Sequence, residues 1–251
     1  MASEKSLAIV LRVRDFSETS CVVTLFTRSL GKITALAKGA HRPKSPFESA
    51  LDLMAVCRIV FLHKSSDVLD LLTEAKLERR FRAAGRDLSR LYAGYYVIEL
   101  LNDLTDTADP HPKLFDVANS MLASLDDEGP VVPIVLRFEL TMLRELGHMP
   151  SLVDCVGCGQ RVGDDDRVAF GQLAGGVLCR KCRMGQKQVV SVRKQVIETM
   201  RRLADPENQN WINYVIERGV AGELRGLLSH YLSNLLGKRP RMHNYLGMLT
   251  K

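Results

Sequence analysis

The chain has 251 residues, enough for a substantial core and for two or three small domains, and its composition (46% hydrophobic, 25% charged) is ordinary for a globular protein. It has no run of about eighteen apolar residues and no signal-peptide pattern at its start, so we predict neither a membrane span nor export. We therefore expect a cytoplasmic protein whose six cysteines are metal ligands or core residues rather than disulfides.

The net charge of +6 is distributed unevenly along the chain. Residues 1–80 carry 13 basic and 9 acidic side chains, residues 81–150 carry 6 and 11, and residues 151–251 carry 16 and 9. Such a basic excess suits a nucleic-acid partner, but a solvated basic surface explains it equally well.

The first 80 residues have the pattern of β-strands. In AIVLRVRDF (8–16) the apolar and basic residues alternate, so Ile9, Leu11 and Val13 are predicted on one face and Arg12 and Arg14 on the other. The later strand patterns span 21–27, 32–39, 51–63 and 67–78. Gly31 suits a tight hairpin turn, and KSSD (64–67) a second one. Five strands with short hairpins and one long connection predict a closed barrel of the OB-fold type.

A basic segment, LAKGAHRPKSPF (36–47), leaves the third strand pattern. It presents four side chains within seven residues: Lys38, His41, Arg42 and Lys44. Cations on a loop stiffened by prolines suit phosphate contacts, although most charged loops are simply solvated. Four further residues would extend this surface if the barrel brings the hairpin ends together: Arg12, Arg14, Arg28 and Lys32.

From about residue 86 the sequence period becomes helical. In the segment 87–104 one predicted stripe contains Leu88, Leu91, Tyr92, Tyr95, Ile98 and Leu101. The other predicted helices span 111–125, 129–147, 191–204 and 221–237, with prolines near two of the starts and Gly147 at one end. These helices predict a mainly α-helical domain made of residues 81–150 and 184–251.

Four cysteines between these helices have the spacing of a metal site. Cys155, Cys158, Cys179 and Cys182 form C-x2-C-x20-C-x2-C, and four thiolates complete the tetrahedral shell of Zn²⁺. A closed shell leaves no position for a reactive water, so the expected role is structural, in an insert spanning 151–183. Redox pairs and an iron–sulfur site are the alternatives. Cys21 and Cys57 lie in strand patterns and are expected to be buried apolar residues.

Signatures of catalysis are missing from the sequence. It contains no H-x-E beside the cysteines, no H-E-x-x-H, no phosphate-binding G-x-x-x-x-G-K-[ST] and no G-x-S-x-G. The six histidines show no ligand spacing. We therefore expect a protein that is not an enzyme; a nuclease or other hydrolase would need a carboxylate or histidine cluster.

Three stretches, in order, resemble one protein family. VRDFSETSCVVTLFTRSLGKITALAKGAHRPKS (13–45) resembles the N-terminus of RecO, the bacterial recombination mediators, in its E-x-S, its LFT, its G-K turn and its A-K-G-A-x-R-P-K-S. FELTMLRELGHMPSLVDCVGCG (138–159) is similar to a second family pattern, and GGVLCRKC (175–182) to a third. The resemblance covers roughly residues 7–183. Near the C-terminus the family often has a lysine followed by serine and arginine, whereas this chain has GKRPRMHNYL. The resemblance therefore implies no function for that segment.

The resemblance implies an α+β multidomain protein: an N-terminal OB-fold β-barrel (1–80), then the mainly α-helical domain with a four-cysteine zinc-binding insert. It implies binding to single- and double-stranded DNA and annealing of complementary strands. It further implies that the protein works with RecR and the single-stranded DNA-binding protein to load RecA, and that no membrane is among its partners. It also implies a bacterial, nucleoid-associated location. Some members lack the cysteines, which favours a structural zinc. The rival hypothesis is an RNA-binding or transcription-associated OB-fold and zinc module.

Overall fold

The computed structural model describes residues 3–47, 50–63, 69–85, 87–127, 129–163 and 165–246. The chain divides into two compact units, Met1–Glu128 and Gly129–Lys251. The first contains a β-barrel and two long helices, and the second contains a small sheet and three long helices among the described residues. The finer division at residues 80, 150 and 183 stays a prediction. No helix in the described part of the chain combines the length and the apolar character needed to cross a membrane.

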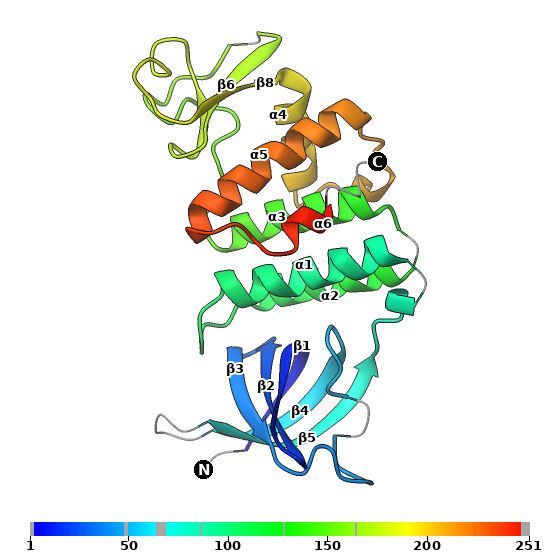
Figure 1. The fold of residues 1–251 in the computed structure, drawn as a ribbon. Coiled ribbons are helices and arrows are strands. Elements are labelled where there is room, and N and C mark those ends of the chain that lie inside the picture. The colour runs from blue at the N-terminus through cyan, green and yellow to red at the C-terminus, as the bar shows by residue number, and fades with distance from the viewer. Residues whose placement is uncertain are drawn as a thin grey trace. The chain divides into compact units, whose positions relative to one another are not determined.

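Five strands of the first unit form a closed barrel (Figure 1). They are β1 (Ser3–Ser17), β2 (Ser20–Thr27), β3 (Gly31–Ala37), β4 (Val56–Leu62) and β5 (Asp70–Arg79). The order around the barrel is β1-β2-β3-β5-β4, and the β3–β5 pair is parallel while the others are antiparallel. This is an OB-type barrel, so the predicted fold class is confirmed. The predicted turn KSSD lies outside the described residues.

The two faces of β1 differ from the prediction. Ala8 and Val10 belong to the barrel interior and Val13 packs against it, whereas Ile9 and Leu11 are buried outside that cluster, on the strand that contacts helix α1 (Leu88–Leu104). The cause is a β-bulge, because the pairing with β2 shifts register between Val10 and Arg12. The predicted face of Ile9, Leu11 and Val13 is therefore wrong.

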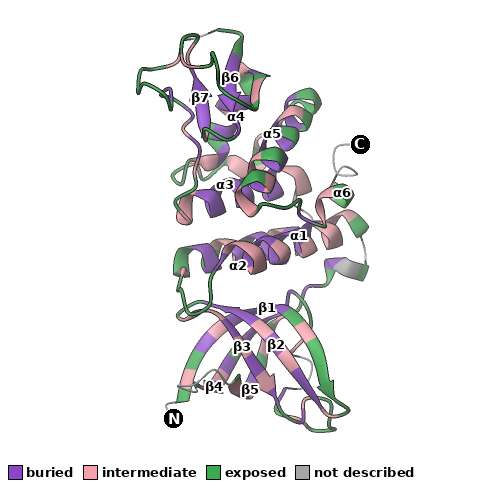
Figure 2. Ribbon diagram, turned by 60° about the vertical axis from the view of Figure 1, so that its left-hand side comes forward, coloured by how far each residue is buried: buried purple, intermediate pink, exposed green. Residues whose placement is uncertain are grey.

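Helices α1 and α2 (Pro112–Asp126) cover one end of the barrel (Figure 2). Phe26 of β2 and Phe115 of α2 pack with ring centroids 6.1 Å apart. At the β2–β3 turn, Gly31 has a φ of +70°, and a Cβ there would lie 2.1 Å from the carbonyl oxygen of Asp109. Only glycine permits this approach between the hairpin and the connection of α1 to α2.

The buried face of α1 is rotated from the predicted stripe. Ile98 and Leu101 of that stripe are buried as predicted, but Leu88 is 64% exposed. Tyr96, Val97 and Leu100, outside the stripe, are buried as well. The small residues next to them explain the difference, because a Cβ at Gly94 would lie 2.5 Å from the sulfur of Met54. The predicted stripe was based on the large apolar residues alone, so it did not include the close packing of α1 through small residues such as Gly94.

The second unit combines helices with a three-stranded antiparallel sheet. Its elements are α3 (Val131–Glu145), β6 (Arg167–Gly171), β7 (Gly176–Leu178), β8 (Val189–Arg193), α4 (Lys194–Ala204), α5 (Arg218–Leu236) and α6 (His243–Leu246). The sheet order is β7-β6-β8. The sequence patterns missed this sheet, and the start of the helix predicted over 191–204 is wrong, because residues 191–193 belong to β8.

Candidate nucleic-acid interface and metal centre

One end of the barrel brings together the β1–β2 hairpin and the loop that follows β3. Cys21 pairs with Ala37, and the backbone N–H of Gly39 donates to Ser20 Oγ at 3.0 Å. The N–H of His41 donates to the carbonyl oxygen of Thr19, also at 3.0 Å. Two segments that are about twenty residues apart in sequence therefore form one surface.

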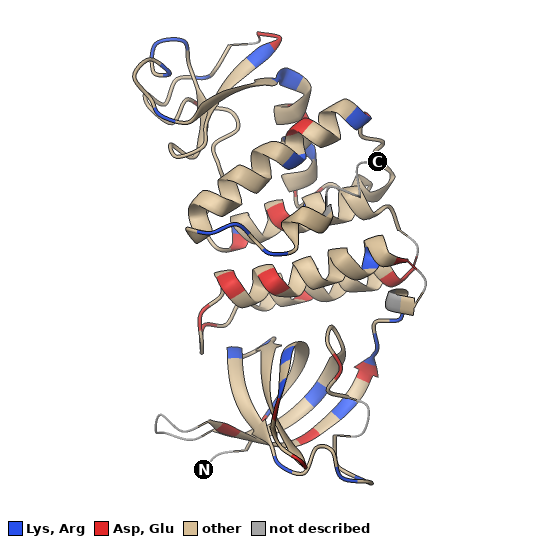
Figure 3. Cartoon of the chain, viewed as in Figure 1, with Lys and Arg blue, Asp and Glu red and all other residues tan. Residues whose placement is uncertain are grey.

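We call this surface the basic end of the barrel. It contains six of the eight predicted DNA-binding residues, all exposed: Arg12, Arg14, Lys38, His41, Arg42 and Lys44. His41 Nε2 lies 3.2 Å from Asp15 Oδ1. Among the residues that the structure describes, no ion pair involves the other five, so their cationic groups are available to an external anion. Figure 3 shows Lys and Arg in blue along both segments.

Arg28 and Lys32 lie at the other end of the barrel, because the two hairpins occupy opposite ends of β2. Arg28 donates from Nε and Nη2 to the two carboxylate oxygens of Asp116, at 2.8 and 2.9 Å, and this hydrogen-bonded ion pair raises the pKa of Arg28. Arg28 and Lys32 were predicted to extend the basic surface if the barrel brought the hairpin ends together. The barrel keeps these two residues away from the basic end.

The ammonium of Lys32 stabilises the end of helix α1. It donates to the carbonyl oxygens of Asn102, at 2.6 Å, and of Thr105, the C-cap residue. Burial lowers the pKa of Lys32, against the opposing effect of Asp106 and Asp103. A cation at the C-terminus of a helix meets the negative end of the helix dipole, so Lys32 has a structural partner inside the first unit.

In the second unit, two short turns bring four cysteines together. The Sγ atoms of Cys155, Cys158, Cys179 and Cys182 all lie within 4.8 Å of one another. Those of Cys158 and Cys179 are 3.9 Å apart, close to the separation of about 3.8 Å that tetrahedral ligands at about 2.3 Å from zinc would have. A side chain at Gly157 would meet Cys182 Cβ at 2.9 Å, so the glycine lets the two turns approach.

Electrostatics at the four thiols favours a bound cation. Burial opposes ionisation of Cys155, but N–H groups of Cys179, Gly157 and Cys158 donate to its sulfur and lower its pKa to about 6. Hydrogen bonds with the sulfurs of Cys179, Cys158 and Cys155 raise the pKa of Cys182 to about 12. Cys155 therefore loses its proton readily, whereas Cys182 keeps its proton when the neighbouring thiols are ionised. A divalent cation would relieve the repulsion between the thiolates.

The apolar support around the cysteines is small. The cluster contains Cys155, Ala169 and Leu178, with Val162 and Val189 among the partly buried residues packed against it. The other face of the sheet is buried through Phe170, Val177 and Val192, so the two cysteine turns are the part of this region with the least apolar support, where a metal ion would contribute most to folding. The residues present could hold a metal ion.

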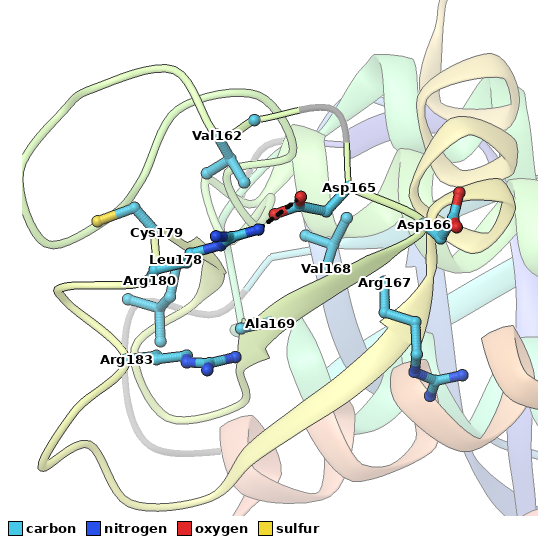
Figure 4. A pocket seen from close by; sticks show the side chains of 11 residues that line it. Val162, Asp165, Asp166, Arg167, Val168, Ala169, Leu178, Cys179, Arg180 and Arg183 are labelled. Atoms are coloured by element: carbon cyan, nitrogen blue, oxygen red, sulfur yellow. Dashed lines mark hydrogen bonds and ion pairs between the residues drawn. The ribbon is translucent and has the colours of Figure 1, made fainter.

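Beside the cysteines lies a cavity of about 760 Å³ with mixed charge (Figure 4). Arg180 and Asp165 reach toward each other inside it and form an ion pair at 2.8 Å. Cys179 is the one cysteine of the cluster among the lining residues. Its arginines and carboxylates neutralise one another in part, and the lining has no histidine.

A second feature that sequence patterns missed is an apolar groove in the second unit, with a volume of about 490 Å³. Its lining residues are Pro130, Val132, Pro133, Ile212, Asn213, Tyr214, Val215, Ile216, Arg218 and Ala221. Val215 is 89% exposed, and the guanidinium carbon of Arg202 lies 5.2 Å from the centre of the Tyr214 ring. The signal in the sequence was WINYVI (211–216), an apolar run with no helix or strand pattern.

Comparison with known proteins identifies relatives along the whole chain. Residues 1–81 match the family described as Recombination protein O N terminal, and residues 85–244 match Recombination protein O C terminal. A DNA repair protein RecO from Rhodopirellula baltica is 43% identical over 96% of this chain and 97% of its own length. DNA repair proteins RecO from Symbiobacterium thermophilum (32% identical, 96% and 95% of the two chains) and Myxococcus xanthus (30% identical, 96% of each) are also similar.

Proposed function

Because the chain belongs to the RecO family of DNA repair proteins, we propose that it is a recombination mediator that binds single- and double-stranded DNA and anneals complementary strands. The observation that carries this proposal is the basic end of the barrel. Its five arginines and lysines without an ion pair among the described residues lie on two adjacent segments.

The proposed mechanism is binding without bond-making chemistry. Phosphates of two strands are held at once by the cations of the basic end, which lowers the repulsion that opposes pairing. Each phosphate contact releases counterions, so the affinity should fall steeply with salt. Cys155, Cys158, Cys179 and Cys182 would hold a structural Zn²⁺, which fixes the turns of the insert and leaves no open position for chemistry.

Partner proteins belong to the same proposal. On this view the protein works with RecR and with the single-stranded DNA-binding protein to load RecA, in the bacterial cytoplasm and at the nucleoid. The apolar groove lined by Ile212, Tyr214 and Val215 supports a partner-binding role for the helical region, because an exposed concave apolar surface is typical of peptide docking.

The test reverses three charges at the basic end. We expect Lys38→Glu, Arg42→Glu and Lys44→Glu together to weaken binding to a single-stranded oligonucleotide at least about 100-fold and to reduce the salt slope by about 2, measured by fluorescence anisotropy. The matched control changes the exposed residues Lys5, Lys76 and Lys113 to Glu, which makes the same change in net charge outside the basic end. Equal losses in both variants, or none in the first, would contradict a local interface.

The rival function, RNA binding, predicts that the affinity for RNA exceeds the affinity for DNA. Competition between single-stranded DNA, duplex DNA and RNA of equal length separates the two hypotheses. Annealing of complementary DNA coated with the single-stranded DNA-binding protein supports the mediator, whereas preferential RNA binding without annealing supports the RNA-binding module.

A further inference from the structure

Phe16 is the most exposed aromatic side chain in the described part of the chain, at 65% of its full accessible surface. The other described phenylalanines are buried, including Phe26 and Phe61 of the same barrel. Solvation of an aromatic ring is unfavourable, and folding here places one at the tip of the β1–β2 hairpin. Its position at the basic end suggests that the ring contacts a ligand.

A β-bulge sets the position of Phe16. Asp15 pairs with Cys21 and Ser17 pairs with Ser20, so the pairing of β1 with β2 shifts by one residue and Phe16 is the extra one. A bulged residue leaves the regular alternation of the strand, and bulges of this kind commonly re-aim a side chain at a binding site. The exposure of Phe16 is thus built into the hairpin.

The charges around Phe16 suit a nucleic-acid strand. Arg12 and Arg14 precede it on β1, and the loop with Arg42 and Lys44 joins the same end through the contact of His41 with Thr19. The hairpin also holds two carboxylates: Asp15 is paired with His41, and Glu18 is exposed. A flat apolar ring among exposed cations matches a ligand that has both aromatic faces and phosphates.

We propose that Phe16 stacks on an unpaired base of single-stranded DNA while the cations of the basic end contact the flanking phosphates. This inference rests on the proposed DNA-binding function and adds strand selectivity to it. Bases inside a duplex are already stacked on each other, so the ring gains a face to stack on only from a single strand. Stacking covers the face of a base and leaves its pairing edge open, which is compatible with annealing.

The test compares Phe16→Ala and Phe16→Trp in the full chain. We expect Phe16→Ala to bind single-stranded DNA roughly 5- to 100-fold more weakly, since stacking on an aromatic side chain has that effect per base. Duplex affinity should change less than about two-fold, and the salt slope should stay the same, because no phosphate contact is lost. Phe16→Trp should retain the affinity, and the indole it introduces should be quenched on binding single-stranded DNA, beyond any change that the unmodified protein shows through Trp211.

The matched control is Leu88→Ala, because Leu88 is 64% exposed in the same unit but lies on α1. It should leave both affinities unchanged, and thermal unfolding should show that each variant is folded. Unchanged single-strand affinity in Phe16→Ala, or equal losses for single strand and duplex, overturns the stacking inference while the proposed function stands. If the unmodified protein binds neither DNA, the proposed function itself fails.

Discussion

At the scale of single residues, Lys32 and Lys38 show what a basic pattern leaves open. Lys32 lies near the start of β3 and Lys38 follows its end, six positions later, and the sequence presents both as candidates for DNA contact. Lys32 is bound to two helix carbonyl groups, whereas Lys38 is exposed at the basic end. The difference depends on which end of the barrel the helices cover, and local sequence carries no information on that.

Lys32 and Lys38 should therefore respond differently to the same change. Lys32→Met leaves the carbonyl oxygens of Asn102 and Thr105 without their charged donor, and we expect it to lower the free energy of unfolding by about 1.5–3 kcal/mol. Lys38→Met should leave stability unchanged within about 0.5 kcal/mol and lower the salt slope of DNA binding by about 1. Urea denaturation and anisotropy check this pair, and the opposite pattern would assign Lys32 to DNA.

His243 gives the second unit a pH dependence. Burial lowers its pKa to about 4, with contributions from Arg239, Arg225 and His230, and its Nδ1 lies 2.8 Å from Ser229 Oγ. An unfolded histidine has a pKa near 6.5, so between about pH 6.5 and 4 only the unfolded chain takes up the proton. This contribution to stability is complete above about pH 6.5 and is lost as the pH falls toward about 4.

We expect His243→Gln to flatten the decline in stability over that pH range. Glutamine retains a hydrogen-bonding group for Ser229 but has no proton to take up. Urea unfolding at pH 7, 6 and 5 gives the comparison. Parallel curves for the variant and the unmodified protein would show that other groups cause the decline.

At the scale of elements, α3 and α5 are joined by a buried ion pair. Arg225 Nη1 lies 2.6 Å from Glu139 Oε1, and the side chains are 8% and 0% exposed. Arg225→Met should cost about 3–5 kcal/mol, because the buried carboxylate of Glu139 then loses this charged donor. Changing both residues to Met should recover much of that loss. Urea unfolding tests this, and a double variant no more stable than the single one would contradict it.

Prediction from sequence worked for elements whose pattern is long. The barrel strands and the helices α2, α3 and α5 were found, and the C-x2-C spacings identified four cysteines that the fold brings together. Prediction from sequence failed where details of the backbone determine which residues are buried. A bulge at Leu11 changed the faces of β1, and small residues set the buried face of α1. The strands β6, β7 and β8 of the second unit have only three to five residues, which is too short for a periodic signal.

At the scale of the whole molecule, the barrel and the cysteine cluster fall in different compact units. If the cluster holds the proposed zinc, Cys158→Ser or treatment with a chelator should therefore remove one metal ion per chain and expose the backbone of β6, β7 and β8 to hydrogen exchange. Affinity for single-stranded DNA should change less than about two-fold, because the basic end lies in the first unit. Cys21→Ala, in the barrel, should retain the metal. A large loss of DNA affinity would make the insert part of the interface.

The arrangement of the units along the chain also bears on how the protein is made. β1 pairs with both β2 and β4, so it leaves the ribosome before its partner β4, which ends at Leu62. Closure of the barrel also requires β5. All of these strands and the helices that cover them precede Gly129. We expect the barrel to close before Cys179 and Cys182 are synthesised, so that ribosome-arrested chains ending near residue 170 already resist protease up to α2. The unit with the proposed DNA-binding surface would then be finished while the unit with the cysteine cluster is still being translated.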